Sequence, residues 1–403
     1  MKNCQLLFIS FAFAIDKKFT EVFLNVLLRK GRELRSIKNV WLIAGNISRR
    51  CSGINSTLER VVLHQNKQLG ACVFGGIVSI ASLKKMYFWD FWKLWVQPSG
   101  KPFRIWHARR NSDMVWGIIF RDLLRMPLQL VFTSASQRRQ SKFTQFLTSK
   151  MTTVIATSSG SAFYLNRSSV VIPHGMDVDM FSPASHSLEL RTRLGIPNGI
   201  VVGCFGRIRP SKGTDLFVDA ILPLMRERDD VYALLTGLLK KQHSDFFQKI
   251  SLKISQENLS SRFIWLGEVD GAQMPNFYRC LDLYVAPQRW EGFGVTPLEA
   301  MASGLPVVAT RVGAFETQII DGETGFLVAP NNADELRDRL NQMIQDRQKR
   351  IQMGKAARDH VVRSFGINRE VKAIHSVYEA IWKSAPLVQE NSSQTKSFWE
   401  ESI

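Results

Sequence analysis

Short, wholly apolar runs alternate with longer amphipathic segments along most of this 403-residue chain. Runs such as VWLIA at 40–44 and LYVAP at 283–287 have the length of buried strands, and the segments between such runs have helical spacing. Strands that alternate with helices predict a parallel sheet covered by helices on both faces. The alternation starts at 40–44 and starts again at IVVGCFG, 200–206, so two such domains are expected.

The stretch RWEGFGVTPLEAMASGLPVVAT, residues 289–310, predicts a loop, a short helix and a buried strand in succession. Two glycines make the loop pliable, and Thr296 with Glu299 has the spacing of a capping box at the helix start. Glu291 has no capping role, because it precedes the helix. Loops that follow the strands of such sheets bind ligands. Glu291 is therefore predicted to bind a ligand, whereas Glu299 either caps its helix or binds as well.

A second loop, GRIRPSKGT at 206–214, leads from a predicted strand to a helix that Thr214 would cap. Arg207 and Lys212 flank this loop, just before the helix N-terminus. Free N–H groups and the helix dipole attract phosphate there, and the two cations add charge. The loop is not a Walker P-loop, because Lys212 precedes Gly213 and no Ser or Thr directly follows it. It predicts a phosphate site, and the alternative is a plain basic turn.

Two loops in the first half of the chain carry basic residues beside a predicted strand end. The first predicts either a substrate-binding loop or a solvated basic turn. In the second, His107 is either a satisfied core histidine or a ligand contact. The residues concerned are Arg49, Arg50 and Gly53 in the first loop, and His107, Arg109 and Arg110 in FRIWHARRN, 103–111.

These motifs resemble those of glycosyltransferase family 4, retaining enzymes of the two-domain GT-B type. Glu291 and Glu299 match the family's Glu-x7-Glu signature within the more specific EGFG-x-x-x-LEAMA-x-G-x-P-V-V-A-T. GRIRPSKG is similar to the family's diphosphate loop, and IPHGMDVDMFSP, 172–183, is similar to its interdomain linker. The resemblance spans about residues 40–384. It implies an α/β fold of two Rossmann-like, doubly wound parallel-sheet domains that face each other across a cleft.

The resemblance also divides the chain, although it does not cover the first residues. CQLLFISFAFAI, residues 4–15, imitates a signal peptide but is expected to be a buried element or an added extension. Residues 333–353 and 366–384 are predicted helices. The predicted units are an N-terminal extension at 1–36, an acceptor-binding domain at 37–172, a nucleotide-sugar-binding domain at 173–365, a helix at 366–387 that crosses back to the first domain, and a flexible tail at 388–403.

A role for each site residue follows from the same resemblance. Two loop cations would take the place of a metal beside the diphosphate, and no Asp-x-Asp motif accompanies them, so neither a metal nor a cofactor is expected. The implied contacts are Glu291, Phe293, Gly294, Val295 and, from the opposite domain, His107 for the transferred sugar; Glu299 for the ribose; Arg207 and Lys212 for the donor diphosphate; and Arg49, Arg50, Gly53, Arg109 and Arg110 for the acceptor.

Within the family, FRIWHARRN, VIATSS and VIPHG look most like lipopolysaccharide core mannosyltransferases. This implies transfer of mannose from GDP-mannose to a Kdo-containing lipid A precursor, by attack on the face that the leaving group occupies. The alternative is a UDP-sugar donor, glucosyl or galactosyl, with another anionic lipid or polysaccharide acceptor.

The distribution of charge along the chain indicates a further partner. The formal net charge is +18, and residues 1–172 hold 26 Lys and Arg against 7 Asp and Glu, whereas the remainder holds 27 against 28. Such asymmetry predicts an anionic partner. An acidic membrane face is favoured, and a nucleic-acid-binding protein is a remote alternative, because no nucleic-acid motif matches. Five scattered cysteines fit a reducing compartment. The predicted location is cytoplasmic, attached peripherally to the inner membrane.

The segment KKMYFWDFWKLWV, 84–96, places three tryptophans at intervals of three residues. At helical spacing Trp89, Trp92 and Trp95 form one aromatic stripe. The stripe is either packed into a core or domain contact, or it lies in a lipid headgroup region, where Trp and Lys are favoured.

Overall fold

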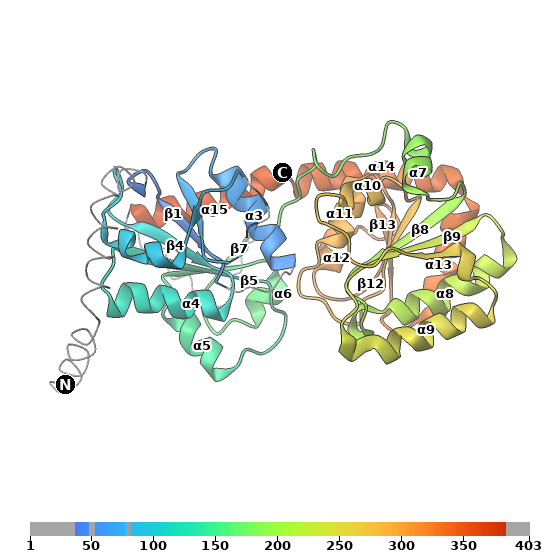
Figure 1. The fold of residues 1–403 in the computed structure, drawn as a ribbon, viewed down its shortest axis with the longest axis horizontal. Helices are drawn as coiled ribbons and strands as arrows, with labels where there is room; N and C mark the ends of the chain where they lie inside the picture. Colours follow the sequence, from blue (N-terminus) through green and yellow to red (C-terminus); the bar gives the residue numbers. More distant parts are fainter. Residues whose placement is uncertain (1–36, 48–52, 77, 79, 81, 384–403) are drawn as a thin grey trace, which may run out of the picture.

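The computed structural model describes residues 37–47, 53–76, 78, 80 and 82–383. Two α/β units lie side by side, each built on one sheet (Figure 1). The predictions for residues 1–36, for the tail at 388–403 and for Arg49 and Arg50 lie outside the described residues.

The N-terminal unit contains a parallel sheet of seven strands in the order β3-β2-β1-β4-β5-β6-β7. Its central strands are buried along their whole length, because helices cover both faces. The strands are β1 (Leu42–Gly45), β2 (Ala71–Phe74), β3 (Lys85–Met86), β4 (Arg104–Ala108), β5 (Leu128–Ser134), β6 (Thr153–Ala156) and β7 (Val170–Val171).

Successive side chains of each strand serve different helix layers. In β4, Ile105 packs with α3 (Gly53–Gln65) and α15 (Ile367–Trp382), while Trp106 packs on the opposite face. The helices of the opposite layer are η2 (Phe88–Trp95), α4 (Asn111–Ile118), η3 (Ile119–Leu123), α5 (Lys142–Ser149) and α6 (Ser159–Phe163).

The C-terminal unit contains a parallel sheet of six strands in the order β10-β9-β8-β11-β12-β13. Its strands are the apolar runs of the sequence, such as IVVGCF and LYVA. They are β8 (Ile200–Phe205), β9 (Val231–Thr236), β10 (Phe263–Trp265), β11 (Leu283–Ala286), β12 (Val307–Thr310) and β13 (Gly325–Val328). Two parallel, helix-covered sheets confirm the predicted fold class.

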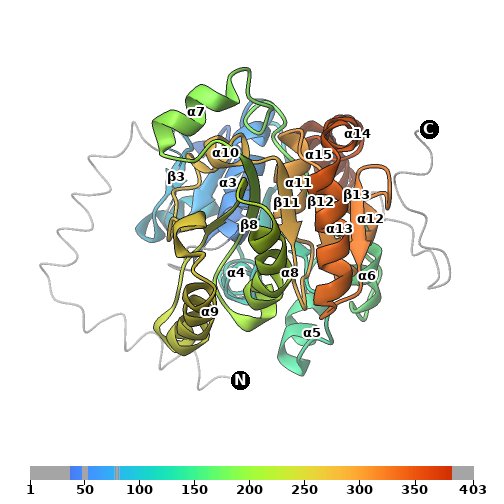
Figure 2. The ribbon, with the colours of Figure 1, turned by 90° about the vertical axis from the view of Figure 1, so that its right-hand side faces the viewer.

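Helices also cover both faces of the second sheet (Figure 2). One layer consists of α8 (Thr214–Glu227), α9 (Ser244–Gln256) and α13 (Ala333–Gln345). The other consists of α7 (Ser187–Leu194), α10 (Met274–Tyr278), α11 (Thr296–Ala302), α12 (Phe315–Gln318) and α14 (Arg347–Ser364). Single turns η4 (Pro210–Lys212), η5 (Lys241–His243) and η6 (Ser260–Arg262) lie in the connections.

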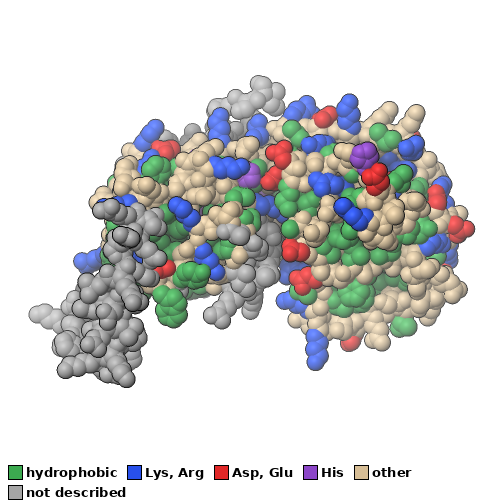
Figure 3. All heavy atoms as spheres, turned by 45° about the horizontal axis from the view of Figure 1, so that its top comes forward, with side chains coloured by type: hydrophobic (Ala, Val, Ile, Leu, Met, Phe, Trp, Pro, Cys, Tyr) green, Lys and Arg blue, Asp and Glu red, His purple; other side chains and the backbone are tan. Residues whose placement is uncertain are grey.

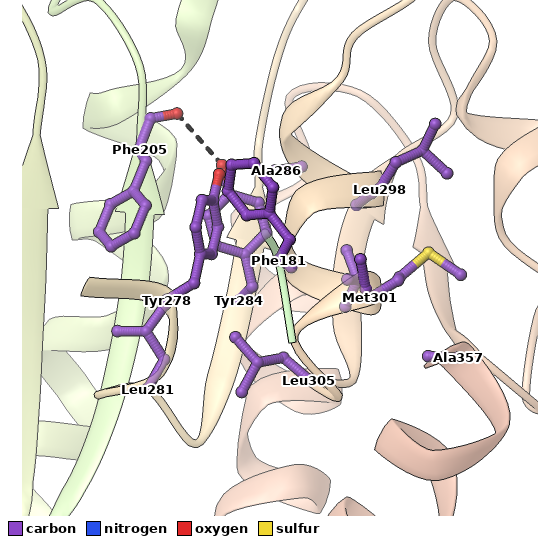
Figure 4. Packing of buried hydrophobic residues seen from close by; sticks show 14 of the residues in the cluster. Phe181, Phe205, Tyr278, Leu281, Tyr284, Ala286, Leu298, Met301, Leu305 and Ala357 are labelled. Atoms are coloured by element: carbon purple, nitrogen blue, oxygen red, sulfur yellow. Dashed lines mark hydrogen bonds between the residues drawn. The ribbon is translucent and has the colours of Figure 1, made fainter. Parts of the chain in front are cut away.

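A dense apolar cluster packs against the buried face of α11. Tyr278, Tyr284 and Phe205 pack there with the inward residues of α11, and the Tyr284 hydroxyl donates to the Phe205 carbonyl oxygen at 3.2 Å (Figure 4). Leu298 and Met301 of α11 are fully buried in this cluster. The short helix is therefore held by packing rather than by its length, since isolated helices of this size are unstable.

The chain crosses between the units twice, and the two crossings touch. Met176 in the first crossing donates its N–H to Phe365 O at 2.6 Å, and Ile367 in the second donates its N–H to Met176 O at 2.9 Å. Helix α15 then packs against α3 in the N-terminal unit, while α14 lies over the C-terminal unit (Figure 1).

Two helix predictions are wrong in their limits. The helix predicted at 333–353 ends at Gln345, because Asp346 has an extended backbone and its carboxylate accepts from the N–H of Lys349 at the start of α14. The sequence TLERVVLHQNKQLG after the first strand also predicts a helix that begins at Thr57, but this helix, α3, already begins at Gly53.

Candidate active site

Two loops meet at the carboxyl ends of β8 and β11, adjacent strands at which the strand order of the second sheet reverses. Loop 206–213 follows β8 and loop 287–295 follows β11. Arg289 joins them. Its backbone N–H donates to Ser211 O at 3.1 Å, and its guanidinium donates to both Asp215 oxygens at 2.7 and 2.9 Å. The two loops that the sequence singled out separately therefore form one surface.

Glycine is required where these loops touch their neighbours. Gly213 has a left-handed backbone with φ of 72°, and a Cβ there would lie 1.8 Å from the carbonyl oxygen of Pro287. Gly292 lies against the other unit, since a Cβ would lie 2.3 Å from the carbonyl oxygen of Ala135. A side chain at either position would push apart the two loops or the two units.

Lys212 and Glu291 form an ion pair at the centre of this surface. The Lys212 Nζ donates to Glu291 Oε2, and the N–H of Gly292 donates to Glu291 Oε1 at 3.0 Å. Only 18% and 17% of the two side chains is exposed. The residues predicted to bind the diphosphate and the sugar are thus direct neighbours, and each compensates the charge of the other.

Glu299 lies deeper, with 6% of its surface exposed. Its Oε1 accepts from Arg60 Nη2 of α3 at 3.1 Å, and its Oε2 accepts from the Tyr278 hydroxyl at 3.0 Å. The predicted capping box is wrong, because Val295 is the N-cap and Thr296 is already helical. The Glu299 carboxylate instead joins the two units across the facing helices α3 and α11 (Figure 1).

The backbone of Phe293, Gly294 and Val295 presents donors. The carbonyl oxygens of Phe293 and Gly294 both accept from Gln318 Nε2 at 3.0 Å. None of the three N–H groups donates to a residue within the described ranges. Such N–H groups at the start of a helix suit hydroxyl or anionic oxygens of a ligand.

Arg207 is exposed at the start of loop 206–213. It lines a cavity of about 60 Å³ together with Arg209 and, from the loop after β9, Lys240 and His243. Arg209 was not among the predicted residues, although the sequence contains a signal for it, because Arg207 and Arg209 would share one face of an extended chain.

His107 is buried in β4, with 4% of its surface exposed. Its Nδ1 lies 2.5 Å from the Tyr378 hydroxyl and its Nε2 lies 2.6 Å from Thr133 Oγ1. Burial, Arg109 and His174 lower the pKa of His107 well below its ordinary value, so the ring is neutral. The predicted contact with a sugar requires one of these two hydrogen bonds to be exchanged.

A second histidine, His174 of the first crossing, connects the units beside this point. Its Nδ1 lies 3.0 Å from Glu370 Oε1 of α15, and its ring meets the Phe293 ring edge-on at 5.1 Å between centroids. Glu370 Oε2 also accepts from the Gly175 N–H at 2.7 Å. The loop that carries Phe293 is therefore braced against the N-terminal unit by residues that no local sequence pattern identified.

The predicted acceptor residues that the structure describes are engaged within the protein. The Arg109 guanidinium donates to Thr57 Oγ1 at 3.4 Å, and burial lowers its pKa while Glu370 opposes that shift. Arg110 is the N-cap of α4 and donates to Asn46 Oδ1 at 3.4 Å. Gly53 is the first residue of α3. Within the described residues, neither Arg109 nor Arg110 forms a hydrogen bond or ion pair with Lys212 or Glu291.

Neither a metal cluster nor a spanning helix occurs in the described part of the chain. No three His, Cys, Asp or Glu side chains there lie close enough to hold a metal ion. No helix among the same residues is long and apolar enough to cross a bilayer. Cys72, Cys204 and Cys280 are free thiols and are buried.

Two facing parallel-sheet units, with a cationic loop and a carboxylate loop at the switch point of the second sheet, have the GT-B fold. The chain belongs to the family of group 1 glycosyl transferases, and the family model "Glycosyl transferases group 1" matches residues 188–360. The protein is thus an enzyme that transfers sugars.

Relatives of known name cover most of the chain. It is similar to the lipopolysaccharide core biosynthesis mannosyltransferase LpsB of Rhizobium meliloti, with 41% identity over 86% of this chain and 99% of that protein. It is also similar to the lipopolysaccharide core biosynthesis mannosyltransferase LpcC of Rhizobium leguminosarum, with 40% identity over 86% and 97%. Among solved structures, the chain is similar to Anabaena HepE in complex with UDP and glucose, with a TM-score of 0.72 over 84% of this chain and 99% of that one. The sequence identity is 21%, so this similarity concerns the fold alone.

Proposed function

We propose that the protein is a retaining mannosyltransferase of lipopolysaccharide core biosynthesis, which moves mannose from GDP-mannose to a Kdo-containing lipid A precursor. The observation that carries this proposal is the 41% identity to a mannosyltransferase of that pathway over 86% of the chain. The paired loops support it, since they join a carboxylate to cations where a nucleotide sugar would bind.

In this mechanism the cations act on the leaving group. Departure of the diphosphate leaves negative charge on its oxygens and positive charge on the sugar. Arg207, Lys212 and the N-terminus of α8 would stabilise the diphosphate. Because these groups would supply the positive charge that a metal ion otherwise provides, the mechanism needs no metal.

The carboxylate loop acts on the sugar. Glu291 would accept from sugar hydroxyls, and the N–H groups of Phe293 to Val295 would donate to them. Glu299 would accept from the ribose, beside Arg60. The acceptor hydroxyl attacks the face that the diphosphate leaves, and a diphosphate oxygen accepts its proton. No protein nucleophile is assigned.

The donor is decided by a transfer assay. The purified enzyme, incubated with a Kdo-lipid acceptor, should transfer label from GDP-mannose and not from UDP-glucose, UDP-galactose or GDP-glucose. A site that hydrogen-bonds the 2-hydroxyl in one orientation discriminates against the epimer by leaving polar groups unpaired. Scintillation counting of extracted lipid measures the product. Transfer from UDP-glucose alone would refute the mannosyl assignment without affecting the fold.

The membrane part of the proposal rests on an exposed aromatic face of the N-terminal unit. Residues 88–95 form a 3₁₀ helix, in which residues three apart eclipse one another, so Trp89, Trp92 and Trp95 share one side. Trp89 is 81% exposed and Trp95 is 46% exposed, while Leu94 of the same helix is fully buried. Trp89 and Trp95 therefore face outward, while Trp92 between them is half-buried.

Further apolar and basic residues extend this face. The Trp95 Nε1 donates to Leu124 O at 2.8 Å, which places the stripe beside Leu123, itself 67% exposed. Lys84 and Lys85 precede this helix, Arg125 follows Leu124, and all three are exposed. Lys and Arg side chains outnumber acidic ones on the visible face of the N-terminal unit (Figure 3). Trp and Leu beside Lys and Arg suit an anionic bilayer surface.

Replacing Trp89 and Trp95 by serine should lower binding to liposomes that contain acidic lipid by about tenfold or more. Each buried aromatic ring contributes roughly 1.5–3 kcal/mol of apolar transfer. Binding of the wild-type protein should also fall as salt rises, because screening limits the attraction to about 8 Å at physiological ionic strength. Sedimentation with liposomes across a salt series measures both effects.

The matched control is Trp265→Ser, since Trp265 is 39% exposed but lies in the C-terminal unit. It should leave liposome binding unchanged. Equal binding of all proteins to neutral and acidic liposomes at every salt concentration contradicts the membrane proposal.

A further inference from the structure

The cationic loop continues β8 as an extended chain beyond the sheet. Ile208 forms a parallel bridge with Leu239, and its N–H donates to Leu238 O at 3.1 Å. Ile208 is buried, with 1% exposed. Because alternate residues of an extended chain point to opposite sides, Arg207 and Arg209 share the side away from Ile208. The fold thus places two guanidinium groups next to each other.

Arg209 has no ion-pair partner in the part of the chain that the structure describes. Its Nε is buried and has no hydrogen-bond partner among the described residues. The carboxylate that acts on it, Glu291, is already bonded to Lys212 Nζ and to the Gly292 N–H. Burial and then the charge of Arg207 lower the pKa of Arg209, so its surroundings disfavour the cation.

The same guanidinium borders a cavity with more positive charge. The cavity of about 60 Å³ between loops 206–213 and 237–243 is lined by Arg207, Ile208, Arg209, Leu238, Lys240, Gln242 and His243, none of them acidic. A cavity needs a volume of ~10–15 Å³ to hold one water molecule, so this cavity has room for several waters or for a phosphate-sized group. A buried donor without a partner costs free energy unless a ligand accepts from it.

We propose that Arg209 is a further donor-binding residue, whose Nε–H donates to a phosphate oxygen of the nucleotide sugar at the mouth of this cavity. The inference rests on the proposed function, which supplies a diphosphate ligand. In the free enzyme Lys212 is paired with Glu291. In the complex Arg207, Arg209 and Lys212 would together face a dianionic diphosphate. Arg209 would fix the orientation of the leaving group as well as its charge.

The test uses Arg209→Met, which keeps an apolar side chain as far as the position of Nε and removes the charge and the donors. Affinity for inorganic pyrophosphate and for GDP, measured by calorimetry, should fall by about 10- to 100-fold, the effect of one charge-assisted hydrogen bond. The free variant should unfold at a higher temperature than the wild type, because a disfavoured cation is removed. Guanosine affinity should not change.

Arg228→Met is the matched control, because 40% of the Arg228 side chain is exposed and it pairs with Asp230 at 2.8 Å in the same unit. It should bind pyrophosphate like the wild type. A structural role for Arg209 gives the opposite pattern, with a lower unfolding temperature and unchanged pyrophosphate affinity, and overturns the proposal. So does pyrophosphate that binds the wild type without competing with GDP, or that does not bind at all.

The two proposals fail in different ways. Pyrophosphate binding that depends on Arg209, without transfer from GDP-mannose, leaves the phosphate contact standing and removes the mannosyl function. Transfer from GDP-mannose with a pyrophosphate affinity that does not depend on Arg209 supports the mannosyl function and removes the Arg209 contact.

Discussion

Replacing Glu291 by alanine should lower the turnover of sugar transfer by about two to three orders of magnitude, the scale of one lost electrostatic contact in a transition state. Its carboxylate is fixed by Lys212 and by the Gly292 N–H, so it is oriented before the sugar arrives. As positive charge develops on the sugar, a nearby fixed carboxylate stabilises the transition state more than the ground state. Initial rates at saturating donor measure the loss.

The ion pair sharpens this prediction. Glu291 competes with phosphate for the Lys212 ammonium, so the Glu291→Ala enzyme should bind GDP at least as tightly as the wild type. Glu291→Gln, which keeps the shape and removes the charge, should behave similarly. Glu257→Ala is a suitable control. Glu257 pairs with Arg226 at a distance of 3.4 Å, and this pair is not part of the two loops. A Glu291→Ala enzyme that keeps more than half its activity would show that the sugar is held elsewhere.

The fold class could be predicted because its signal is local and repeated. β8, β11 and β12 are buried on both faces, so their sequences are nearly continuous apolar runs. In the loop and helix at 289–302, Gly marks the turn, and Thr and Pro mark the start of the helix. The strand PVVAT is likewise confirmed as β12, Val307–Thr310. Each of these elements is specified by a handful of adjacent residues.

The partners of the site residues could not be predicted, because they come from distant segments. Glu299 is bonded to Arg60, 239 positions earlier in the chain, and His107 to Tyr378, 271 positions later. A capping box was the nearest local explanation for Glu299. It fails because a buried carboxylate is better satisfied by a guanidinium and a tyrosine hydroxyl than by one backbone N–H.

The tryptophan stripe shows an intermediate case. A spacing of three fits both an α-helix and a 3₁₀ helix, and only the latter keeps Trp89, Trp92 and Trp95 in line. Which side faces outward depends on Phe91 and Leu94, whose packing partners lie in other elements; the Phe91 ring stacks on Phe120 at 6.1 Å. The sequence thus supplied the stripe, and tertiary packing decided its exposure.

Replacing Lys212 by methionine should lower both the affinity for the nucleotide and the turnover, whereas the change at Glu291 should lower turnover alone. Lys212 stands at the end of η4, directly before the N-terminus of α8, where a diphosphate gains most from added positive charge. We expect GDP affinity to fall by about 10- to 100-fold and turnover by about 100- to 1,000-fold. Calorimetry and single-turnover rates separate the two effects.

Lys253→Met is the matched control, since Lys253 pairs with Asp219 at 2.7 Å on the surface of the same unit. Transfer by the wild-type enzyme should continue in EDTA, because Arg207 and Lys212 are proposed to do the work of a metal; a strict need for Mg²⁺ or Mn²⁺ contradicts that mechanism. Wild-type GDP affinity in the Lys212→Met variant would contradict the diphosphate assignment itself.

A double substitution tests whether the ion pair links the two loops during catalysis. Once Lys212 is replaced by methionine, the Gly292 N–H is the hydrogen-bond partner that Glu291 keeps among the described residues, and the carboxylate repels an incoming phosphate. Adding Glu291→Ala should therefore restore part of the GDP affinity, because that repulsion disappears, while turnover stays low, because the sugar has lost its carboxylate. Independent roles would instead give additive effects on affinity and on rate. Partial recovery of binding without recovery of transfer is the result expected if Lys212 serves the leaving group and Glu291 serves the sugar.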